Sequence, residues 1–348
     1  MPRPMRTLTY AEALAEALVQ GMEHDPGIFV CGIGVDDHKG IFGTTRAAFE
    51  RFGPTRVFDV PIAEQALTGV AIGAALMGKR PVVVHARNDF MFLATDQMIN
   101  LAAKARYMFG GRLRVPMVVR SIIGKGWGQG ATHSQSLQAL FAHFPGLQVV
   151  MPALPRDAKG LTLAALRAAG PVVILEHRAL YETKGPVPEA PEATPLGTTA
   201  VVREGRDVTV AATSLMVIEA LRAADLLAPH GVDVEVLDCR SIRPFDRGTL
   251  LASLAKTGRV VVADTSWISF GMASEIASVC VEEGFGDLRA PIRRIGLADC
   301  PAPVSLALER AFYPDHRAIV RECLAVLERD PELLQLEPLQ DSVFRGPY

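Results

Sequence analysis

Short apolar runs alternate with helical segments along most of this 348-residue chain. Runs such as 28–31, 81–84 and 172–176 are brief and rich in valine and isoleucine, which favours buried strands. The segments between them, such as 10–22 and 158–168, carry apolar residues at helical spacing. Strands that alternate with helices predict parallel sheets covered by helices. The expected fold class is therefore α/β, with doubly wound parallel sheets.

The length allows two domains, each with its own core. Four prolines lie between residues 184 and 195, and proline disrupts both helices and sheet ladders, so we expect neither element there. The predicted organisation is an N-terminal domain over 1–183, a proline-rich linker over 184–197, a smaller α/β domain over 198–330 and a tail over 331–348.

Composition excludes several classes of partner and site. A net charge of −2 gives no reason to expect nucleic acid or an anionic membrane as a partner. The five cysteines are scattered and have no zinc-binding spacing, which indicates reduced core thiols. The N-terminus has no hydrophobic signal core, and no apolar run is long enough to span a bilayer. These features predict a cytoplasmic protein.

One carboxylate stands at the start of an apolar helical segment. A β-branched run ends at Pro61, and the segment from Ala66 to Met77 contains no charged residue. A helix that is apolar on every side is expected to be buried, so Glu64 in its first turn would lie in a low-dielectric environment. Taken alone, Glu64 would be interpreted as an acid that interacts with the helix dipole.

A glycine-rich segment at 124–136 contains His133 and follows an expected strand, where open α/β sheets bind ligands. Two further segments, 96–108 and 144–152, flank it. Together with the segment around Glu64, in this order and spacing, they resemble the β subunit (E1β) of the thiamine-diphosphate-dependent 2-oxo acid dehydrogenases, in the transketolase superfamily. The resemblance runs from about residue 8 to about residue 327.

The resemblance implies roles for individual residues. In that family a carboxyl group hydrogen-bonds N1′ of the cofactor's aminopyrimidine, which promotes loss of the thiazolium C2 proton; Glu64 matches it. Phe90 matches the ring that packs on the aminopyrimidine, and Ile62 is also placed at the cofactor. His133 matches the imidazole that faces the reacting carbon, where it can stabilise or protonate an oxyanion. The structural alternatives are a helix-cap acid, core packing for Phe90 and a surface-loop histidine.

The family also holds a structural monovalent cation, usually potassium, with backbone carbonyls. The resemblance implies such a site in this chain, although a family acid is replaced by Ala168. The matching positions are Met117, Ala165, Leu166, Ala168 and Gly170.

Two segments depart from the family pattern. Ile33 stands where many relatives carry an acid, and Asp36 and Asp37 are nearby. Over residues 84–90, this chain has charged and polar side chains where relatives have an apolar, aromatic wall. Either Arg87 forms a local salt bridge with Asp89, or the substrate is polar or anionic. On the second interpretation the substrate pocket contains His85, Arg87, Asp89 and His133.

The chain lacks the Gly-Asp-Gly segment, followed by asparagine, that binds diphosphate and magnesium in thiamine enzymes. The resemblance therefore implies that an α subunit supplies the Mg²⁺ ligands, within an α₂β₂ heterotetramer that has a β–β contact. A lipoyl acyltransferase would be the usual acceptor. The expected function is that of a β chain which, with its α subunit, decarboxylates a 2-oxo acid and passes on the acyl group.

Three alternatives remain open. The enzyme could transfer ketol or acyl groups of a polar substrate without a lipoyl partner, as transketolase-like proteins do. The segment from Gly32 to Asp37 follows a strand and resembles a dinucleotide-binding loop, although the third glycine is missing. A non-catalytic scaffold chain is the third alternative, and the presence of Glu64 and His133 argues against it.

Overall fold

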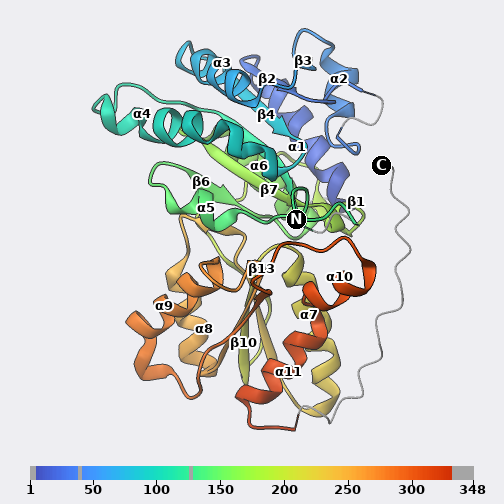
Figure 1. Ribbon diagram of the computed structural model, residues 1–348, viewed down its shortest axis with the longest axis vertical. Coiled ribbons are helices and arrows are strands. Elements are labelled where there is room, and N and C mark those ends of the chain that lie inside the picture. Colours follow the sequence, from blue (N-terminus) through green and yellow to red (C-terminus); the bar gives the residue numbers. More distant parts are fainter. Residues whose placement is uncertain (1–4, 38–40, 125–127, 331–348) are drawn as a thin grey trace. The chain divides into compact units, whose positions relative to one another are not determined.

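The computed structural model describes residues 5–37, 41–124 and 128–330. The chain forms two compact units (Figure 1). The first consists of Met1–Gly124, Leu137–Gly197 and Ser241–Pro244, and the second of Lys125–Ser136, Thr198–Arg240 and Phe245–Tyr348. The expected tail over 331–348 lies outside the described residues.

A seven-stranded sheet forms the centre of the first unit, in the order β12-β6-β7-β5-β4-β2-β3. Every neighbouring pair is parallel except β12–β6. This sheet confirms the α/β prediction, because parallel strands need helical crossovers between them. The strands are β2 (Ile28–Gly32), β3 (Val57–Phe58), β4 (Arg80–His85), β5 (Val118–Ile123), β6 (Gln148–Val150), β7 (Val172–His177) and β12 (Ser241–Arg243).

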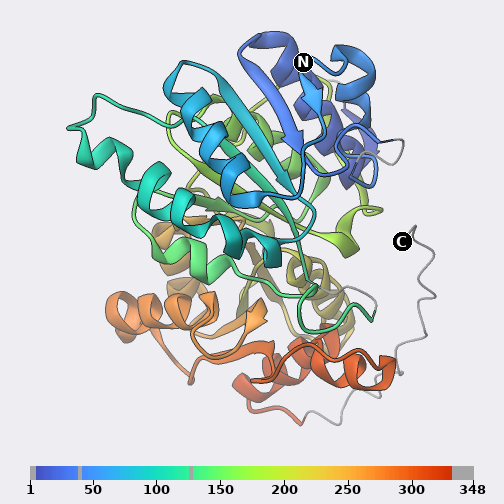
Figure 2. The ribbon, with the colours of Figure 1, turned by 45° about the horizontal axis from the view of Figure 1, so that its top comes forward.

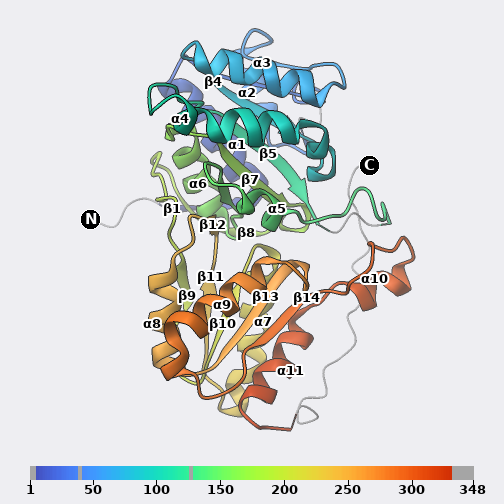
Figure 3. The same cartoon turned by 60° about the vertical axis from the view of Figure 1, so that its left-hand side comes forward.

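Helices connect these strands. α1 begins with a capping box between Thr9 and Glu12 and packs against α6. α3 packs against η1 and η2, beside the continuous η2–α4 helix (Figures 2 and 3). The elements are α1 (Tyr10–His24), α2 (Arg46–Phe52), α3 (Glu64–Leu76), the 3₁₀ helix η1 (Asn88–Ala94), the π-helical η2 (Gln97–Ala102), α4 (Ala103–Met108), α5 (Gln138–His143), α6 (Pro155–Arg167) and the 3₁₀ helix η3 (Arg178–Leu180).

The prediction that α3 is buried on every side is wrong for the single chain. Glu64, Thr68 and Ile72 face the interior, whereas Val70 is 71% exposed and Met77, the residue that ends the helix, is 84% exposed. The apolar character of the segment therefore includes a face that the chain itself leaves uncovered. Exposed apolar surface of this kind is typical of a contact with another protein.

The prediction that residues 184–195 contain neither helix nor strand is also wrong. Lys184–Pro188 forms strand β8, which pairs antiparallel with β1 (Met5–Thr9) in a two-stranded sheet. Pro186 and Pro188 are two residues apart, so both ring nitrogens face the same side of the strand. Proline is tolerated on an edge strand, where that side needs no ladder hydrogen bond.

The second unit contains a five-stranded sheet in the order β14-β13-β10-β11-β9, in which only β9 is antiparallel. Helices α8 and α9 lie on one side of it, and α7 and α11 lie on the other (Figure 1). The strands are β9 (Ala200–Arg203), β10 (Val208–Ala212), β11 (Val234–Asp238), β13 (Val260–Trp267) and β14 (Arg293–Leu297). The helices are α7 (Leu215–Leu227), η4 (Ala228–His230), α8 (Arg247–Thr257), α9 (Met272–Gly284), η5 (Phe285–Asp287), α10 (Leu306–Phe312) and α11 (His316–Val326).

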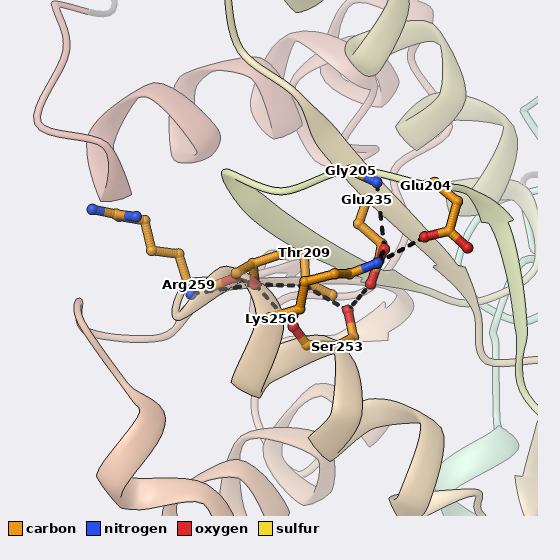
Figure 4. Close-up of polar contacts among 8 residues, drawn as sticks. Glu204, Gly205, Thr209, Glu235, Ser253, Lys256 and Arg259 are labelled. Atoms are coloured by element: carbon orange, nitrogen blue, oxygen red, sulfur yellow. Dashed lines mark hydrogen bonds and ion pairs between the residues drawn. The ribbon is translucent and has the colours of Figure 1, made fainter.

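A polar network joins β11 to α8 in this unit (Figure 4). The buried carboxylate of Glu235 accepts hydrogen bonds from Ser253 and Lys256, and Ser253 also contacts Thr209, with 2.7 Å between the two hydroxyl oxygens. Hydrogen bonds to Glu204 and Glu235 raise the pKa of Lys256. Both oxygens of Glu235 have partners within the network, so its role is structural.

The cysteines agree with the composition analysis. All five are free thiols, and four of them are buried. Burial raises the pKa of Cys31 to about 12, which keeps that thiol protonated and unreactive at neutral pH. In the part of the chain that the structure describes, no helix combines the length and the apolar character needed to cross a membrane.

A buried ion pair joins β5 to β7. Arg120 and Glu176 are each about 1% exposed, and the guanidinium donates two hydrogen bonds to the carboxylate, at 2.6 and 3.0 Å. Tyr181 donates a third bond to Glu176, at 2.8 Å. Desolvation lowers the pKa of Arg120, but the attraction of Glu176 outweighs it and raises the pKa overall. The pair holds together the two strands whose carboxyl ends carry the site described below.

We expect Glu176→Gln to lower the free energy of unfolding by about 3–5 kcal/mol, because it leaves the Arg120 charge buried without a counter-ion. Chemical denaturation measures this change. The double variant Arg120→Met/Glu176→Leu should recover much of the loss. As a control, Glu50→Gln breaks an exposed pair with Arg46 and should change stability by less than about 1 kcal/mol. A similarly small effect of Glu176→Gln would contradict the role given to the pair.

Candidate active site

The carboxyl ends of three neighbouring parallel strands lie side by side in the first unit, and two of the strands end in a histidine. β4 ends at His85, β5 at Ile123 and β7 at His177, and the pairing registers place these strands side by side (Figure 3). In parallel α/β sheets this edge is where ligands bind, because all strands point toward it. Arg87 and Gly124 follow two of these ends.

Glu64 is the first residue of α3, and only 8% of it is exposed. Within the described part of the chain its carboxylate has no hydrogen-bond or ion-pair partner. A buried carboxylate without a partner is costly, so such a group is suited to a donor from outside the chain. Ile62 lies two residues earlier and is 79% exposed. A buried acid therefore lies close in sequence to an exposed apolar side chain. A heteroaromatic ring needs both, since the acid can bind its polar edge and the apolar side chain can contact its carbon atoms.

Phe90 lies on η1, which packs against α3. Its backbone N–H donates to the carbonyl oxygen of Arg87 at 3.2 Å, and its side chain is half-buried. η1, which carries Phe90, therefore lies next to α3, which begins with Glu64. An aromatic face and a carboxyl group from neighbouring elements suit a heteroaromatic ligand.

His85, at the end of β4, is 4% exposed. Burial lowers the pKa of its imidazole to about 4, so the ring is neutral at pH 7. Its Nε2 atom has no hydrogen-bond partner among the described residues, and its carbonyl oxygen accepts a bond from Ser121 at 3.0 Å. His85 therefore brings a polar edge to this region but no positive charge.

Arg87 is a buried cation, 6% exposed, whose Nη1 atom donates to the carbonyl oxygen of Gly124 at 3.3 Å. Asn88 joins this segment to α5: its Oδ1 accepts the N–H of Leu137 and its Nδ2 donates to Asp89, both at 3.0 Å. The charged residues of the segment are thus held in the wall of the sheet edge rather than in solvent.

His177 was missed by the sequence analysis. Gly124 has φ +79°, and a Cβ atom there would lie 2.2 Å from Nε2 of His177, so only glycine fits against this ring. Nδ1 of His177 accepts the N–H of Ala179 at 3.2 Å. The available signal was its position at the end of a buried strand, the same as that of His85.

His133 belongs to the second unit, whereas Glu64, Phe90 and Arg87 belong to the first. The His133 side chain is half-buried, and its Nδ1 atom is 2.9 Å from the hydroxyl oxygen of Thr132. Its backbone N–H donates to the carbonyl oxygen of Gly130 at 3.4 Å. Both contacts lie within the loop, and the one with Thr132 involves the imidazole.

Four of the five carbonyls expected to bind a monovalent cation already accept hydrogen bonds. Nη1 of Arg80 donates to Leu166 at 3.2 Å and to Ala168 at 2.9 Å. The Met117 and Ala165 carbonyls accept backbone N–H groups, at 3.0 and 3.1 Å. Arg80 is also paired with Asp25 at 3.1 Å. A guanidinium therefore lies at the C-terminus of α6, where the helix dipole favours positive charge.

The segment from Gly32 to Asp37 is held by an acid from outside it, Asp59. The Asp59 carboxylate accepts the N–H of Gly34 at 2.8 Å, and Asp36 accepts the N–H of Asp59 at 3.2 Å. Among the described residues, the next helix is α2, which begins at Arg46. A dinucleotide-binding loop leads directly into a helix N-terminus, so this geometry gives that alternative no support.

Comparisons with known proteins cover both units. Residues 6–184 match the transketolase pyrimidine-binding domain, and residues 197–319 match the transketolase C-terminal domain. The chain is 43% identical over 320 residues to subunit beta-2 of the mitochondrial pyruvate dehydrogenase E1 component of Oryza sativa, covering 91% of this chain and 85% of that protein. It is 40% identical over 319 residues to the beta subunit of acetoin:2,6-dichlorophenolindophenol oxidoreductase of Cupriavidus necator, covering 89% and 94%.

A solved structure of a split-gene transketolase, described as an inactive beta4 tetramer, has a TM-score of 0.75 and 28% identity, and it covers 92% of this chain and 98% of that one. The transketolase of Leishmania mexicana, at 18% identity and a TM-score of 0.67, shares the fold. These matches extend over both units. The chain therefore belongs to the β subunits (E1β) of the thiamine-diphosphate-dependent 2-oxo acid dehydrogenases, within the transketolase superfamily.

Proposed function

We propose that the chain is the catalytic β subunit of a two-component enzyme that decarboxylates a 2-oxo acid and transfers the acyl group to a lipoyl acceptor. The observation that carries this proposal is Glu64, a buried acid at a helix start without a hydrogen-bond or ion-pair partner in the described part of the chain. The relatives named as pyruvate dehydrogenase E1 subunits support the same reaction class.

Thiamine diphosphate, when bound, supplies the carbon that adds to the keto group and accepts the electron pair released by decarboxylation. Glu64 would hold a proton at N1′ of its aminopyrimidine ring. Phe90 would pack on the face of that ring, and the exposed Ile62 would exclude water from its edge. His133 would donate a proton to the oxygen of the substrate carbonyl and later accept it.

We propose that an α subunit completes the site. The uncovered face of α3, which contains Val70, Leu76 and Met77, lies on the helix that begins with Glu64. A partner that covers this face would also seal the acid from water. The chain contains no Gly-Asp-Gly segment, so we assign the ligands of the diphosphate and of Mg²⁺ to that partner. A β–β contact and an α₂β₂ assembly belong to the same proposal.

The second candidate function is transfer of a ketol or acyl group of a polar substrate without a lipoyl partner. The buried Arg87 and Asp89 favour it, because they belong to the segment that has polar groups in place of the family's apolar wall. The split-gene transketolase, with a similar fold, is described as a transketolase rather than a dehydrogenase component.

The predicted potassium site does not fit the contacts observed at its carbonyls. The Arg80 guanidinium donates to two of the five carbonyls, and a K⁺ ion beside it would meet a like charge. The acid of the family pattern, which would offset that repulsion, is Ala168 here. We therefore propose that the Arg80 guanidinium supplies the positive charge at these carbonyls in place of potassium.

Glu64→Gln should leave assembly with the α subunit intact and lower turnover by at least about a hundredfold, because an amide cannot exchange a proton with N1′ and general acid–base contributions are about 10² to 10⁴. Exchange of the cofactor's C2 proton, followed by NMR in the assembled enzyme, measures the step directly. Gln65→Glu is a control that keeps Glu64 and alters an exposed neighbour. An unchanged exchange rate in Glu64→Gln would remove this residue from the mechanism.

Arg87→Leu should raise KM for a substrate with a second polar or anionic group by about tenfold or more, because a hydrogen bond to a charged group contributes about 1.5–3 kcal/mol. It should also improve the relative use of simple aliphatic 2-oxo acids. The values of kcat/KM for pyruvate, a branched-chain and a polar 2-oxo acid provide the test. Arg114→Leu, at an exposed arginine of the same unit, is the control. An unchanged ranking would mean that Arg87 is structural.

The melting temperature of the chain should be the same in potassium, sodium and choline chloride at equal ionic strength. Arg80→Met should lower it and make it sensitive to potassium, because the carbonyls of α6 then lose their charged donor. Arg51→Met, at an arginine that is 65% exposed, should do neither. Selective stabilisation of the unaltered chain by potassium would show that the cation binds after all.

A further inference from the structure

The loop that carries His133 is attached to a buried acid from the far end of the sequence. Oε1 of Glu309, on α10, accepts the backbone N–H of Gly128 at 2.9 Å. The two residues are 181 positions apart, and both belong to the second unit. Glu309 is 2% exposed, so its carboxylate is removed from water and depends on such donors.

Val304, just before α10, contacts the same loop. Gly128 and Gly130 have φ values of +84° and +71°, a conformation that favours glycine. A Cβ atom on Gly130 would lie 2.8 Å from Cγ2 of Val304, and one on Gly128 would lie 3.5 Å from its carbonyl oxygen. The loop therefore lies so close to Val304 that a side chain at position 130 would push the loop and Val304 apart.

These contacts continue to the backbone of His133. Gly128 is held by Glu309, Gly130 packs on Val304, and the carbonyl oxygen of Gly130 accepts the N–H of His133 at 3.4 Å. Between these anchors, Gln129, Ala131 and Thr132 are exposed. These contacts hold the backbone of the loop on the way to His133. The bond to the Glu309 carboxylate is charge-assisted and therefore stronger than a bond between neutral groups.

We propose that Glu309 is a positioning residue for His133: it fixes the glycine loop so that the imidazole is held ready for proton transfer to the substrate. This inference rests on the role given to His133 in the proposed function. It assigns a catalytic consequence to the C-terminal domain, which contributes through α10 rather than through a residue that touches the cofactor.

The test compares Glu309→Leu, which removes the acceptor, with Glu309→Gln, which keeps an oxygen that can accept the Gly128 N–H. In the assembled enzyme, Glu309→Leu should lower kcat by about tenfold or more with little change in KM, and Glu309→Gln should retain most of the activity. Hydrogen exchange over residues 128–136 should accelerate in the leucine variant only. Glu282→Leu, at an exposed acid on α9, is the matched control.

Two further measurements separate positioning from a general loss of structure. Exchange of the cofactor's C2 proton, which depends on Glu64, should be unchanged in Glu309→Leu. In a His133→Ala background, Glu309→Leu should cause no further loss of kcat, because both changes act through the same imidazole. Additive losses, or C2 exchange that slows together with turnover, would overturn the proposal.

The two proposals fail in different ways. If Glu64→Gln leaves C2 exchange unchanged, the proposed function is wrong. If Glu64→Gln acts as expected but Glu309→Leu changes neither kcat nor hydrogen exchange in the loop, only the positioning role is wrong. Should Glu309→Leu fail to fold, Val304→Gly tests the same attachment at the second contact, with the same expected loss of kcat and the same double variant with His133→Ala.

Discussion

Parallel strand pairing is the constraint on which the candidate site depends. Because β4, β5 and β7 run in one direction, their carboxyl ends bring residues from three distant parts of the sequence to one edge. The buried pair between Arg120 and Glu176 fixes two of these strands. Glu64 reaches the same unit on α3, where burial without a described partner makes its carboxyl group available to a bound ring. The chemistry proposed for the site therefore depends on the parallel sheet and on the buried position of Glu64.

The sequence predicted the sheets well, since strand and helix periodicities are local properties. The run at 81–84 became Arg80–His85. Strand β5 begins at Val118, after Pro116, because proline cannot donate to a ladder. β8 was missed because its partner, β1, lies about 180 residues away in the sequence. The uncovered face of α3 was misjudged for a related reason: apolar residues predict burial, but they do not say whether the same chain provides it.

The candidate site shows the same division. Glu64 and His133 were proposed from motifs, and Phe90 from its place in the family pattern. The bond between Glu309 and Gly128 and the packing of His177 on Gly124 could not be read from sequence, because each joins segments that only the fold brings together. The Arg80 contacts likewise became visible only in three dimensions, although Arg80 and Ala168 are both plain in the sequence.

The central claim is that this chain holds one half of a thiamine diphosphate site and needs an α subunit for the other. Calorimetric titration of the purified chain with thiamine diphosphate and magnesium tests it most directly, first alone and then with candidate α subunits from the same organism. The account predicts no magnesium-dependent binding in the micromolar range for the chain alone, and binding once the α subunit is present. Micromolar, magnesium-dependent binding by the single chain would contradict it.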